Sequence, residues 1–463
     1  MHLFPDLVRL EKKYPNEIVV IGVHSPKFDN EKDPKSIEKA MARYELHHPV
    51  LNDADRKIWM AYGVEGWPSV GIIDPEGYFV KAYPGQERIY NEADRFIAQL
   101  IRTHRGKKTL NEKPLYFTKA QADLAAKSPL WFPGKVLADG AGKRLFIADS
   151  THHRLVVTDL DGKKLDIVGS GKAGHADGDY ERAMFNDPQG MALNGSILYV
   201  ADRKNHMIRA VDLKGRTVKT IAGTGHQGVY GGRGGAASRT AFNSPWDLLF
   251  VRGELYVAMA GQHQIWVMDL AKHTIVPFAG SGMEDLGDGP RDRSRFAQPS
   301  GLTTDGNKLF VADSEVSAVR AVPLDGTGEV STLVGTGLFD FGDIDDVGKK
   351  ARLQHALGIV YVEGTLYVAD TYNSKIKTLD PRSEACKTFV GGDKKAKLFN
   401  EPGGISHALG KLYVADTNAH RIQVIDLETK AVRTLNLQGV DPPKAGIKEI
   451  HSGPSRASEA TKP

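Results

Sequence analysis

Cysteine is almost absent from this chain: Cys386 is the single one among 463 residues. One thiol excludes an intramolecular disulfide, and it excludes a zinc site built from several cysteines. Cys386 lies in a strand-like segment, where we expect a small packed residue rather than a reactive thiol. Buried thiols that lack a nearby base or cation are inert.

Long apolar runs and a strong net charge are also missing. No run reaches the roughly 18 residues that span a bilayer, and the first residues, MHLFPDLVRLEKKYP, carry charge where a signal peptide is apolar. We therefore expect a cytoplasmic protein without a membrane contact. The net charge is +4, and the basic residues are scattered without stacking aromatics. This pattern argues against a nucleic-acid partner.

A repeat fills residues 132–437. Six strand-like runs, such as LYVAD at 198–202, end in Ala, and in five of them Asp follows. The anchors are Ala148, Ala201, Ala258, Ala312, Ala369 and Ala415. Short strands repeating at this spacing predict a β-propeller in which each repeat is one four-stranded blade. In the last blade the expected strands are 403–407, 411–416, 420–426 and 432–437.

The turn after each of these runs is polar. We expect the Asp to accept backbone N–H bonds from the turn that follows it. Four turns end in histidine, and we expect each to hold its own turn: His153, His206, His263 and His420. The alternative is a ring of metal ligands, but repetition at equivalent positions favours a structural role, and no metal site is expected.

A second repeated element joins the blades: a Gly-rich start, an Ala-x-Phe and then Pro-x-Gly. We expect its apolar residue to anchor the loop between blades, at Phe185, Phe242, Phe296, Leu353 and Phe399. The Pro stops the preceding turn, and the Gly permits close approach near the axis. Acidic pairs in these loops (Asp177 with Asp179; Asp343, Asp345 and Asp346) offer oxygen ligands for Ca²⁺ without EF-hand spacing, so solvated turns are favoured.

These features resemble the NHL repeat, whose hallmark is a PxG start, a VAD strand and an NHR-like turn. Met259, Asp247 and Ala356 depart from it. The resemblance implies a six-bladed ring used for binding, or less often for catalysis at its centre. The expected face or rim residues are Gln189, Trp246, Asp247, Ser300 and Arg320.

The first hundred residues follow an α/β pattern. Helices are expected at 3–13, 34–44, 54–62 and 91–104, and strands at 18–23, 66–74 and 78–83. Gly66-Trp67-Pro68-Ser69, followed by an apolar strand and an Asp-Pro-Glu-Gly turn, resembles a thioredoxin-like domain. The resemblance implies a cis Pro68 that faces a redox dithiol, with Trp67, Pro68 and Ser69 as substrate-binding residues.

The C-x-x-C of that family and the strand that carries it have no counterpart here. Both would lie just before Met1, and the missing strand is central, so 18–23 and 69–73 are expected to lie apart with unpaired backbone. We expect a chain that starts at an internal Met; a degenerate domain is the alternative. The expected division is an incomplete thioredoxin-like domain (1–106), a connector (107–131), an all-β six-bladed NHL propeller (132–437) and a flexible tail (438–463).

The fusion resembles an NHL-repeat-containing family with a thioredoxin module. It implies a thiol–disulfide protein whose propeller docks a partner, with no catalytic residue and no cofactor in this chain. One alternative is a non-enzymatic scaffold that binds protein or peptide on the propeller face or in an interdomain cleft. Another is a metal-dependent lyase or lactonase in the channel, with Asp139, Asp305 and His407 as ligands. A monomer is expected.

Overall fold

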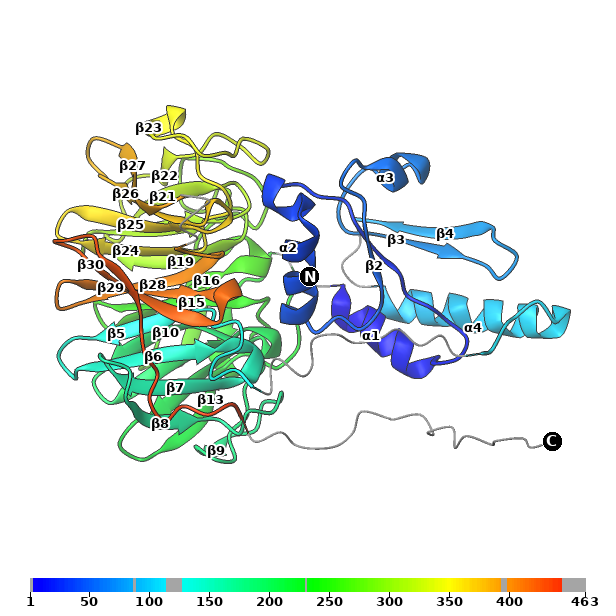
Figure 1. The fold of residues 1–463 in the computed structure, drawn as a ribbon, viewed down its shortest axis with the longest axis horizontal. Helices are drawn as coiled ribbons and strands as arrows, with labels where there is room; N and C mark the ends of the chain where they lie inside the picture. The colour runs from blue at the N-terminus through cyan, green and yellow to red at the C-terminus, as the bar shows by residue number, and fades with distance from the viewer. Residues whose placement is uncertain (1–2, 86–88, 114–126, 230, 393–397, 444–463) are drawn as a thin grey trace, which may run out of the picture. The chain divides into compact units, whose positions relative to one another are not determined.

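The computed structural model describes residues 3–85, 89–113, 127–229, 231–392 and 398–443, and it divides into two compact units, Met1–Ala122 and Asp123–Pro463 (Figure 1). The second unit consists of six β-sheets, each built from consecutive strands. Within the described residues, no helix combines the length and the apolar character that crossing a membrane requires.

Each sheet of the second unit is one blade with four antiparallel strands, as the repeat predicts. The first three blades are β5 (Val136–Asp139), β6 (Arg144–Asp149), β7 (Arg154–Asp159) and β8 (Lys164–Val168); β10 (Pro188–Asn194), β11 (Ile197–Asp202), β12 (Met207–Asp212) and β13 (Thr217–Ala222); and β15 (Pro245–Val251), β16 (Glu254–Met259), β17 (Gln264–Asp269) and β18 (Thr274–Ala279). The last three are β19 (Pro299–Thr304), β20 (Lys308–Asp313), β21 (Ala318–Pro323) and β22 (Ser331–Val334); β24 (Gly358–Val362), β25 (Thr365–Asp370), β26 (Lys375–Leu379) and β27 (Ala385–Gly391); and β28 (Pro402–Ala408), β29 (Lys411–Asp416), β30 (Arg421–Asp426) and β31 (Val432–Thr434).

Three blades carry a fifth, two-residue strand that the sequence did not predict. It comes from the loop that leads into the blade and pairs with the blade's outermost strand. These strands are β9 (Gly178–Asp179), β14 (Gly235–Ala236) and β23 (Asp346–Val347). Each of them covers part of an outer edge that would otherwise present free backbone groups.

The six blades form a closed ring. Each inner strand packs on the inner strand of the next blade, and β28 of the sixth blade packs on β5 of the first (Figure 1). No sheet contains strands from both ends of the described propeller segment; the seam is bridged instead by backbone bonds between Gln438 and the turn at Gly162–Lys164. A six-bladed propeller is therefore the fold of the larger unit.

Buried apolar clusters lie between neighbouring blades. The predicted anchor residues are all buried in these clusters: Phe185, Phe242, Phe296, Leu353 and Phe399. Leu130 takes the same place between the sixth and first blades, three residues before Pro133. Cys386 is buried as well, and burial raises the pKa of its thiol to about 12, which leaves no thiolate at neutral pH.

In its described part, the first unit contains four α-helices and two small sheets. Its helices are α1 (Phe4–Lys13), α2 (Pro34–Arg43), α3 (Lys57–Ala61) and α4 (Tyr90–Lys107). Its strands are β1 (Gly22–His24), β2 (Val50–Asn52), β3 (Ser69–Ile73) and β4 (Phe79–Pro84). A buried cluster joins α1, β4 and α4, and Asp6 of α1 accepts the backbone N–H groups of Ile89 and Tyr90 at the start of α4.

Short 3₁₀ helices complete the elements. One lies in the first unit, η1 (Asp29–Lys32). Five form the turns between the second and third strands of blades: η2 (Ser150–His152), η3 (Arg203–Asn205), η5 (Ala260–Gln262), η7 (Thr371–Asn373) and η8 (Thr417–Ala419). Two lie in the loops between blades: η4 (Ala237–Arg239) and η6 (Gly348–Lys350).

Candidate functional site

The six inner strands start at the Pro-x-Gly positions, and two of the six glycines are replaced by opposite charges. Gly occupies the third position in four blades, at Gly190, Gly301, Gly358 and Gly404. A Cβ on Gly190 would lie 2.4 Å from Cα of Asp247, and one on Gly404 would lie 2.6 Å from Cα of Lys135. The predicted close approach of backbone at these glycines is therefore present.

Lys135 and Asp247 take that position in the first and third blades, and their side chains meet. Lys135 Nζ lies 3.3 Å from Asp247 Oδ2 and donates to the carbonyls of Ser300 (2.6 Å) and Leu357 (2.7 Å). One ammonium from the first blade thus contacts the third, fourth and fifth blades. Burial lowers the pKa of Lys135 and raises that of Asp247, while each charge opposes the shift of the other. The inner strands of the ring are thus linked by an ion pair whose ammonium is buried and hydrogen-bonded.

Asp247, which was expected on a binding face, lies in this ion pair. The other residues expected on that face lie outside the ion pair. Gln189 is buried and donates to Ser150 Oγ (3.2 Å) and Asp187 Oδ1 (2.7 Å). Ser300 is buried too, and its Oγ has no hydrogen-bond partner among the described residues. Trp246 is partly exposed, and the Arg203 guanidinium lies 4.7 Å from its ring centroid. These three residues are kept as candidate binding residues near the start of the inner strands.

Arg320 does not lie on a face, so its placement corrects the expectation. Its side chain is 0% exposed and pairs with Asp313 (3.2 Å) and Asp288 (2.9 Å). A buried guanidinium held by two carboxylates is a structural group, since no partner reaches it. Periodicity along a strand does not show which of its two sides neighbouring elements cover, so the sequence did not distinguish the two placements of Arg320.

Sequence reasoning missed Lys135, Asp187 and Arg203. Arg203 forms an ion pair with Asp187, and both side chains are buried. Lys135 was detectable, because aligning the Pro-x-Gly motifs places a Lys and an Asp where the other blades have Gly. Asp187 has φ = 60° and directly precedes Pro188, a position where four other blades also have a non-glycine residue in the left-handed region before Pro: Phe132, Ser244, Gln298 and Glu401.

The Asp that ends each second strand has a different partner from the predicted one. Its Oδ1 accepts the backbone N–H of a residue in the loop that leads into the same blade, eighteen positions earlier in the first blade and sixteen positions earlier in the others. The pairs are Trp131 N with Asp149, Asn186 N with Asp202, Ala297 N with Asp313, Gln354 N with Asp370 and Asn400 N with Asp416, at 2.6–2.8 Å. The carboxylate therefore holds the incoming loop against the end of the second strand, and in three blades its Oδ2 also contacts a side chain of the following turn: His152, Asn205 or Asn373.

The turn histidines also act differently from the expectation, because they connect neighbouring blades. Nδ1 of each accepts the backbone N–H of the residue before the next blade's Pro. The pairs are His153 with Asp187 N (3.3 Å), His206 with Ser244 N (3.0 Å), His263 with Gln298 N (3.2 Å) and His420 with Phe132 N (3.1 Å). Ser317 and Ser374 make the same link through Oγ in the two blades without the histidine.

The candidate channel ligands do not come together. Asp139 pairs with Arg144 at 2.6 Å, and Asp305 accepts backbone N–H groups in its own turn. Burial lowers the pKa of His407. Among the described residues, the one group of three or more His, Cys, Asp or Glu side chains close enough to share a metal ion lies in the first unit. The lyase or lactonase alternative has no geometric support.

The acidic loop residues considered for Ca²⁺ are neutralised within the chain. Asp177 pairs with Arg209 at 2.7 Å, and Asp343 and Asp345 pair with Lys377 at 3.1 and 3.0 Å. The backbone N–H of Thr220 also donates to Asp177. These carboxylates hold the inter-blade loop against the third strand, which is a role in stability.

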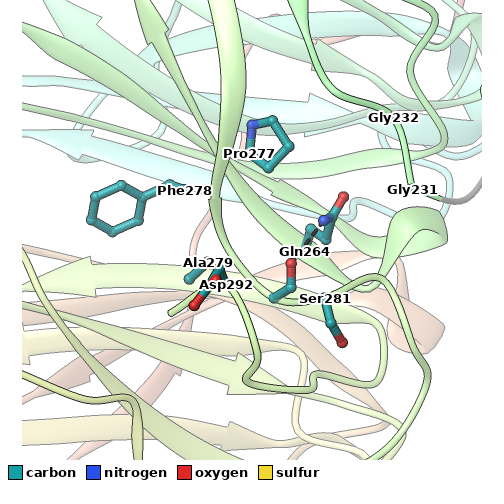
Figure 2. A pocket seen from close by; sticks show the side chains of 9 residues that line it. Gly231, Gly232, Gln264, Pro277, Phe278, Ala279, Ser281 and Asp292 are labelled. Atoms are coloured by element: carbon teal, nitrogen blue, oxygen red, sulfur yellow. Dashed lines mark hydrogen bonds between the residues drawn. The ribbon is translucent and has the colours of Figure 1, made fainter. Parts of the chain in front are cut away.

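A surface pocket of about 230 Å³ lies in the third blade (Figure 2). It is lined by Gly231, Gly232, Gln264, Pro277, Phe278, Ala279, Gly280, Ser281 and Asp292. Gln264, which faces it, already donates to the carbonyl of Gly280 (2.8 Å) and accepts from Trp266 Nε1 (3.0 Å). Asp292 is the single ionisable side chain of this lining, so the pocket offers no acid–base pair.

In the first unit, the Trp67–Pro68 peptide bond is cis, as the resemblance implies. Trp67 is 44% exposed; its Nε1 donates to the carbonyl of Ser25 (2.9 Å), and its ring lies 4.5 Å from that of Trp59. Ser69 Oγ donates to the carbonyl of Gly66 (2.7 Å). Trp67, Pro68 and Ser69 thus form an exposed loop at the start of β3.

Next to this loop the sheet is divided. Within the described residues, β1 pairs with β2 alone and β3 with β4 alone. Apolar side chains are exposed on these strands and on the segment before β1: Val19, Ile21, Val23, Leu51, Ile73 and Phe79. Unpaired strand edges together with exposed β-branched side chains favour pairing with a further strand.

Comparison with known proteins agrees with the propeller. The NHL repeat model matches residues 399–425. NHL repeat-containing protein 2 of Gallus gallus is 40% identical over 450 residues, which cover 88% of this chain and 61% of that protein. Protein SUPPRESSOR OF QUENCHING 1, chloroplastic, of Arabidopsis thaliana is 41% identical over 495 residues and covers 100% of this chain. This chain spans 46% of the Arabidopsis protein.

A further relative matches a small part of the chain. Thiol-disulfide oxidoreductase YkuV of Bacillus subtilis (strain 168) is 24% identical over 98 residues, which cover 20% of this chain and 66% of that protein. This chain thus carries an NHL repeat within a six-bladed propeller and is similar, over most of its length, to NHL repeat-containing proteins.

Proposed function

We propose that this chain is part of a thiol–disulfide redox protein in which a thioredoxin-like unit acts beside a propeller that docks a partner. The observation that carries the proposal is the divided sheet of the first unit. Two unpaired strand edges, β1 and β3, lie in the same unit as the exposed loop of Trp67, cis Pro68 and Ser69. Partial similarity to a thiol-disulfide oxidoreductase supports it.

The chemistry requires groups that this chain does not supply. Thiol–disulfide exchange needs a thiolate that attacks a disulfide, and in this chain the single thiol, Cys386, is buried with a pKa raised to about 12. In the proposal, an additional strand enters between β1 and β3 and carries a C-x-x-C to the start of the helix that follows. There the helix N-terminus favours the thiolate, and Pro68 holds the substrate backbone beside it.

The test has two parts. The first is to read the coding DNA before Met1 for an in-frame apolar strand that ends in C-x-x-C. The second is to measure insulin reduction by the chain as given and by the extended chain, with a Cys→Ser extension as the matched control. We expect turnover by the extended chain alone. A stop codon directly before Met1, or turnover by the chain that lacks a dithiol, would overturn the redox role.

A scaffold without chemistry is the second candidate, and exposed apolar side chains on the propeller favour it. Val229, Met283 and Phe339 lie in three successive inter-blade loops, and each is more than 60% exposed. A Cβ on Gly282 would lie 3.5 Å from Gly231 N, and Leu338 packs in one cluster with Leu286, so the three loops adjoin. We propose that a protein or peptide partner docks on this face. Serine at the three positions should abolish docking, whereas serine at Leu165, Val276 and Leu409 should not.

A further inference from the structure

The outer edges of the blades are covered by other segments of the chain, with one exception among the described residues. The strands β9, β14 and β23 pair with the outermost strands of the second, third and fifth blades. In the fourth blade Gly289 exchanges two backbone hydrogen bonds with Val330, and in the first blade Gln438 accepts the N–H of Lys164 at the start of β8. No described segment pairs with the outer edge of β31 in the sixth blade. An open strand edge of this kind favours pairing with a further strand.

The covering segments of three blades share a carboxylate contact. An Asp in the loop accepts the backbone N–H and the hydroxyl of a Thr in the outermost strand, and it pairs with a cation in the third strand. The sets are Asp177 with Thr220 and Arg209, Asp288 with Thr332 and Arg320, and Asp345 with Thr388 and Lys377. The residue after each Asp pairs with the outermost strand: Gly178, Gly289 and Asp346. A short acidic segment thus covers each of these edges through its backbone and one carboxylate.

Thr434 of β31 is the sixth blade's counterpart of these threonines. It is exposed, and it holds the same register against the third strand as Thr220 does in the second blade. Leu435 N donates to the carbonyl of Ile422 (2.9 Å), and hydrogen-bonded pairs alternate along an antiparallel ladder. The backbone N–H groups of Val432 and Thr434 therefore point away from β30, toward the open edge.

The acidic half of this contact is missing from the sixth blade at the register where three other blades have it. Their Asp lies eight positions before the buried anchor of the same blade, as Asp177 does before Phe185. Eight positions before Phe399 lies Gly391, which pairs with Lys375 inside the fifth blade. The sixth blade thus keeps the threonine and has a glycine in place of its carboxylate.

We propose that the outer edge of β31 binds an extended acidic segment of a partner protein, which pairs with it as a fifth strand. One residue of the segment exchanges two backbone hydrogen bonds with Val432, as Gly289 does with Val330. The carboxylate of the Asp before it accepts the N–H and the hydroxyl of Thr434, whose hydroxyl donates to Gln423 Oε1 (3.0 Å) in the present structure. Backbone pairing supplies affinity in this mode of recognition, and the carboxylate sets the register.

The charges next to β31 favour a negatively charged segment. Arg433 is 50% exposed, with its guanidinium 3.9 Å from the exposed Asp161, and Arg421 is 33% exposed. Attraction between exposed charges is screened by salt, so binding should weaken as the ionic strength rises. The proposal depends neither on the redox role nor on the docking face proposed for the three inter-blade loops.

The probe is a labelled peptide with one of the chain's own covering sequences, GHADGDYER of residues 174–182. It is titrated with the full chain, and fluorescence anisotropy reports binding. Because so small an interface is weak, we expect saturable binding with a Kd below about 1 mM. The matched control peptide carries Asp177→Asn. It should bind about tenfold more weakly, because hydrogen bonds to a charged acceptor are stronger than those to a neutral one.

Variants of the chain locate the site. Thr434→Pro removes the outward N–H and reproduces Pro277, which holds this register in the third blade. It should abolish binding, whereas Thr434→Ser, which keeps both donors, should retain it. Amide exchange of the parent chain gives a second readout if Thr434→Pro fails to fold. The peptide should slow exchange over residues 432–434 and leave residues 217–220, which β9 already covers, unchanged.

The proposal is overturned if the parent chain shows no saturable binding, if the Asp177→Asn peptide binds equally well, or if binding survives Thr434→Pro. Sedimentation of the chain alone tests the other occupant of an open edge. A concentration-dependent dimer that Thr434→Pro abolishes would assign the edge to a second copy of this chain and would likewise overturn the acidic partner.

Discussion

Arg320 illustrates how single residues tie the strands of a blade together. The buried Asp at the end of each second strand pairs with a cation seven residues later in the second, fourth and fifth blades: Arg209, Arg320 and Lys377. In the first and sixth blades the cation comes five residues later, at Arg154 and Arg421. The third blade has Met259 and Trp266 in place of the charges, and both are fully buried. Either a complete ion pair or a complete apolar pair fills the position.

Replacing one charged residue of such a pair should therefore lower the free energy of unfolding more than replacing both residues. Arg320→Met leaves Asp313 buried without its counter-charge and should lower the free energy of unfolding by about 3–5 kcal/mol. Asp313→Met with Arg320→Met should recover part of that loss, although Ala297 N loses its acceptor. Urea unfolding of the three proteins measures this. A double variant less stable than Arg320→Met would contradict it.

The pKa of Asp313 makes the stability of the folded chain depend on pH in a defined direction. Burial raises the pKa of Asp313 from its ordinary 3.8 to about 7, against the opposing charge of Arg320. A carboxyl with a raised pKa in the folded state destabilises that state as pH rises from 3.8 through about 7. The loss in Arg320→Met should thus be largest above pH 7 and should shrink toward pH 4.

At the scale of elements, the turn between the second and third strands joins each blade to the next. Its last residue lies in the left-handed region, with φ between 50° and 56° in all six blades. That residue is His in four blades and Ser in two, and each accepts the N–H of the residue before the next blade's Pro, or before Ala356 in the fifth blade. Both side chains offer an acceptor at the correct reach, which explains why either type serves at this position.

Replacing one of these histidines separates the hydrogen bond from the backbone conformation. His263→Ala and His263→Ser place the same strain on φ, but Ser keeps an acceptor for Gln298 N. His263→Ala should therefore be less stable than His263→Ser by about 1 kcal/mol, the net value of one hydrogen bond. Amide exchange at Gln298, followed by mass spectrometry, should accelerate in the alanine variant first. Equal rates of amide exchange at Gln298 in the two variants would show that the hydrogen bond is not the cause of the difference in stability.

Much of this architecture could be predicted from the sequence, because alternating Leu, Val and Ile around a repeated Ala-Asp define the strands directly. The anchor residues and the glycines near the axis were predicted for the same reason. Partners across long sequence separations could not be predicted: the sequence predicts that Asp149 accepts backbone N–H groups of the following turn, whereas the backbone N–H that it accepts is that of Trp131, earlier in the chain. The burial of Arg320 could not be predicted either, because periodicity shows that a strand has two sides and not which side neighbouring elements cover.

At the scale of the whole molecule, Lys135 and Asp247 connect blades that are not neighbours. The ammonium contacts three of the other five blades through Asp247 and the carbonyls of Ser300 and Leu357. Pairwise contacts between adjacent blades do not by themselves fix the ring's diameter. A bond across the axis does, because it penalises widening or flattening of the ring.

The pair should behave as one unit. Lys135→Met leaves a buried aspartate and should destabilise the propeller by about 3–5 kcal/mol. Lys135→Gly with Asp247→Gly restores the glycine that four blades already have, and should be closer in stability to the parent chain than Lys135→Met is. Thermal unfolding compares the variants. Additive losses in the double variant would show that the two side chains act independently.

The seam between β28 and β5 has one more consequence. Every blade is built from consecutive residues. The chain therefore connects neighbouring blades covalently at five places in the ring. The sixth connection depends on contacts between the first and last sheets and on the segment at Gln438. On warming, we expect the contact between β28 and β5 to be the first contact between blades that is lost. A circular permutation that opens another inter-blade loop and links the old ends of the propeller would move the least stable contact to that loop. The six-bladed ring itself would still form.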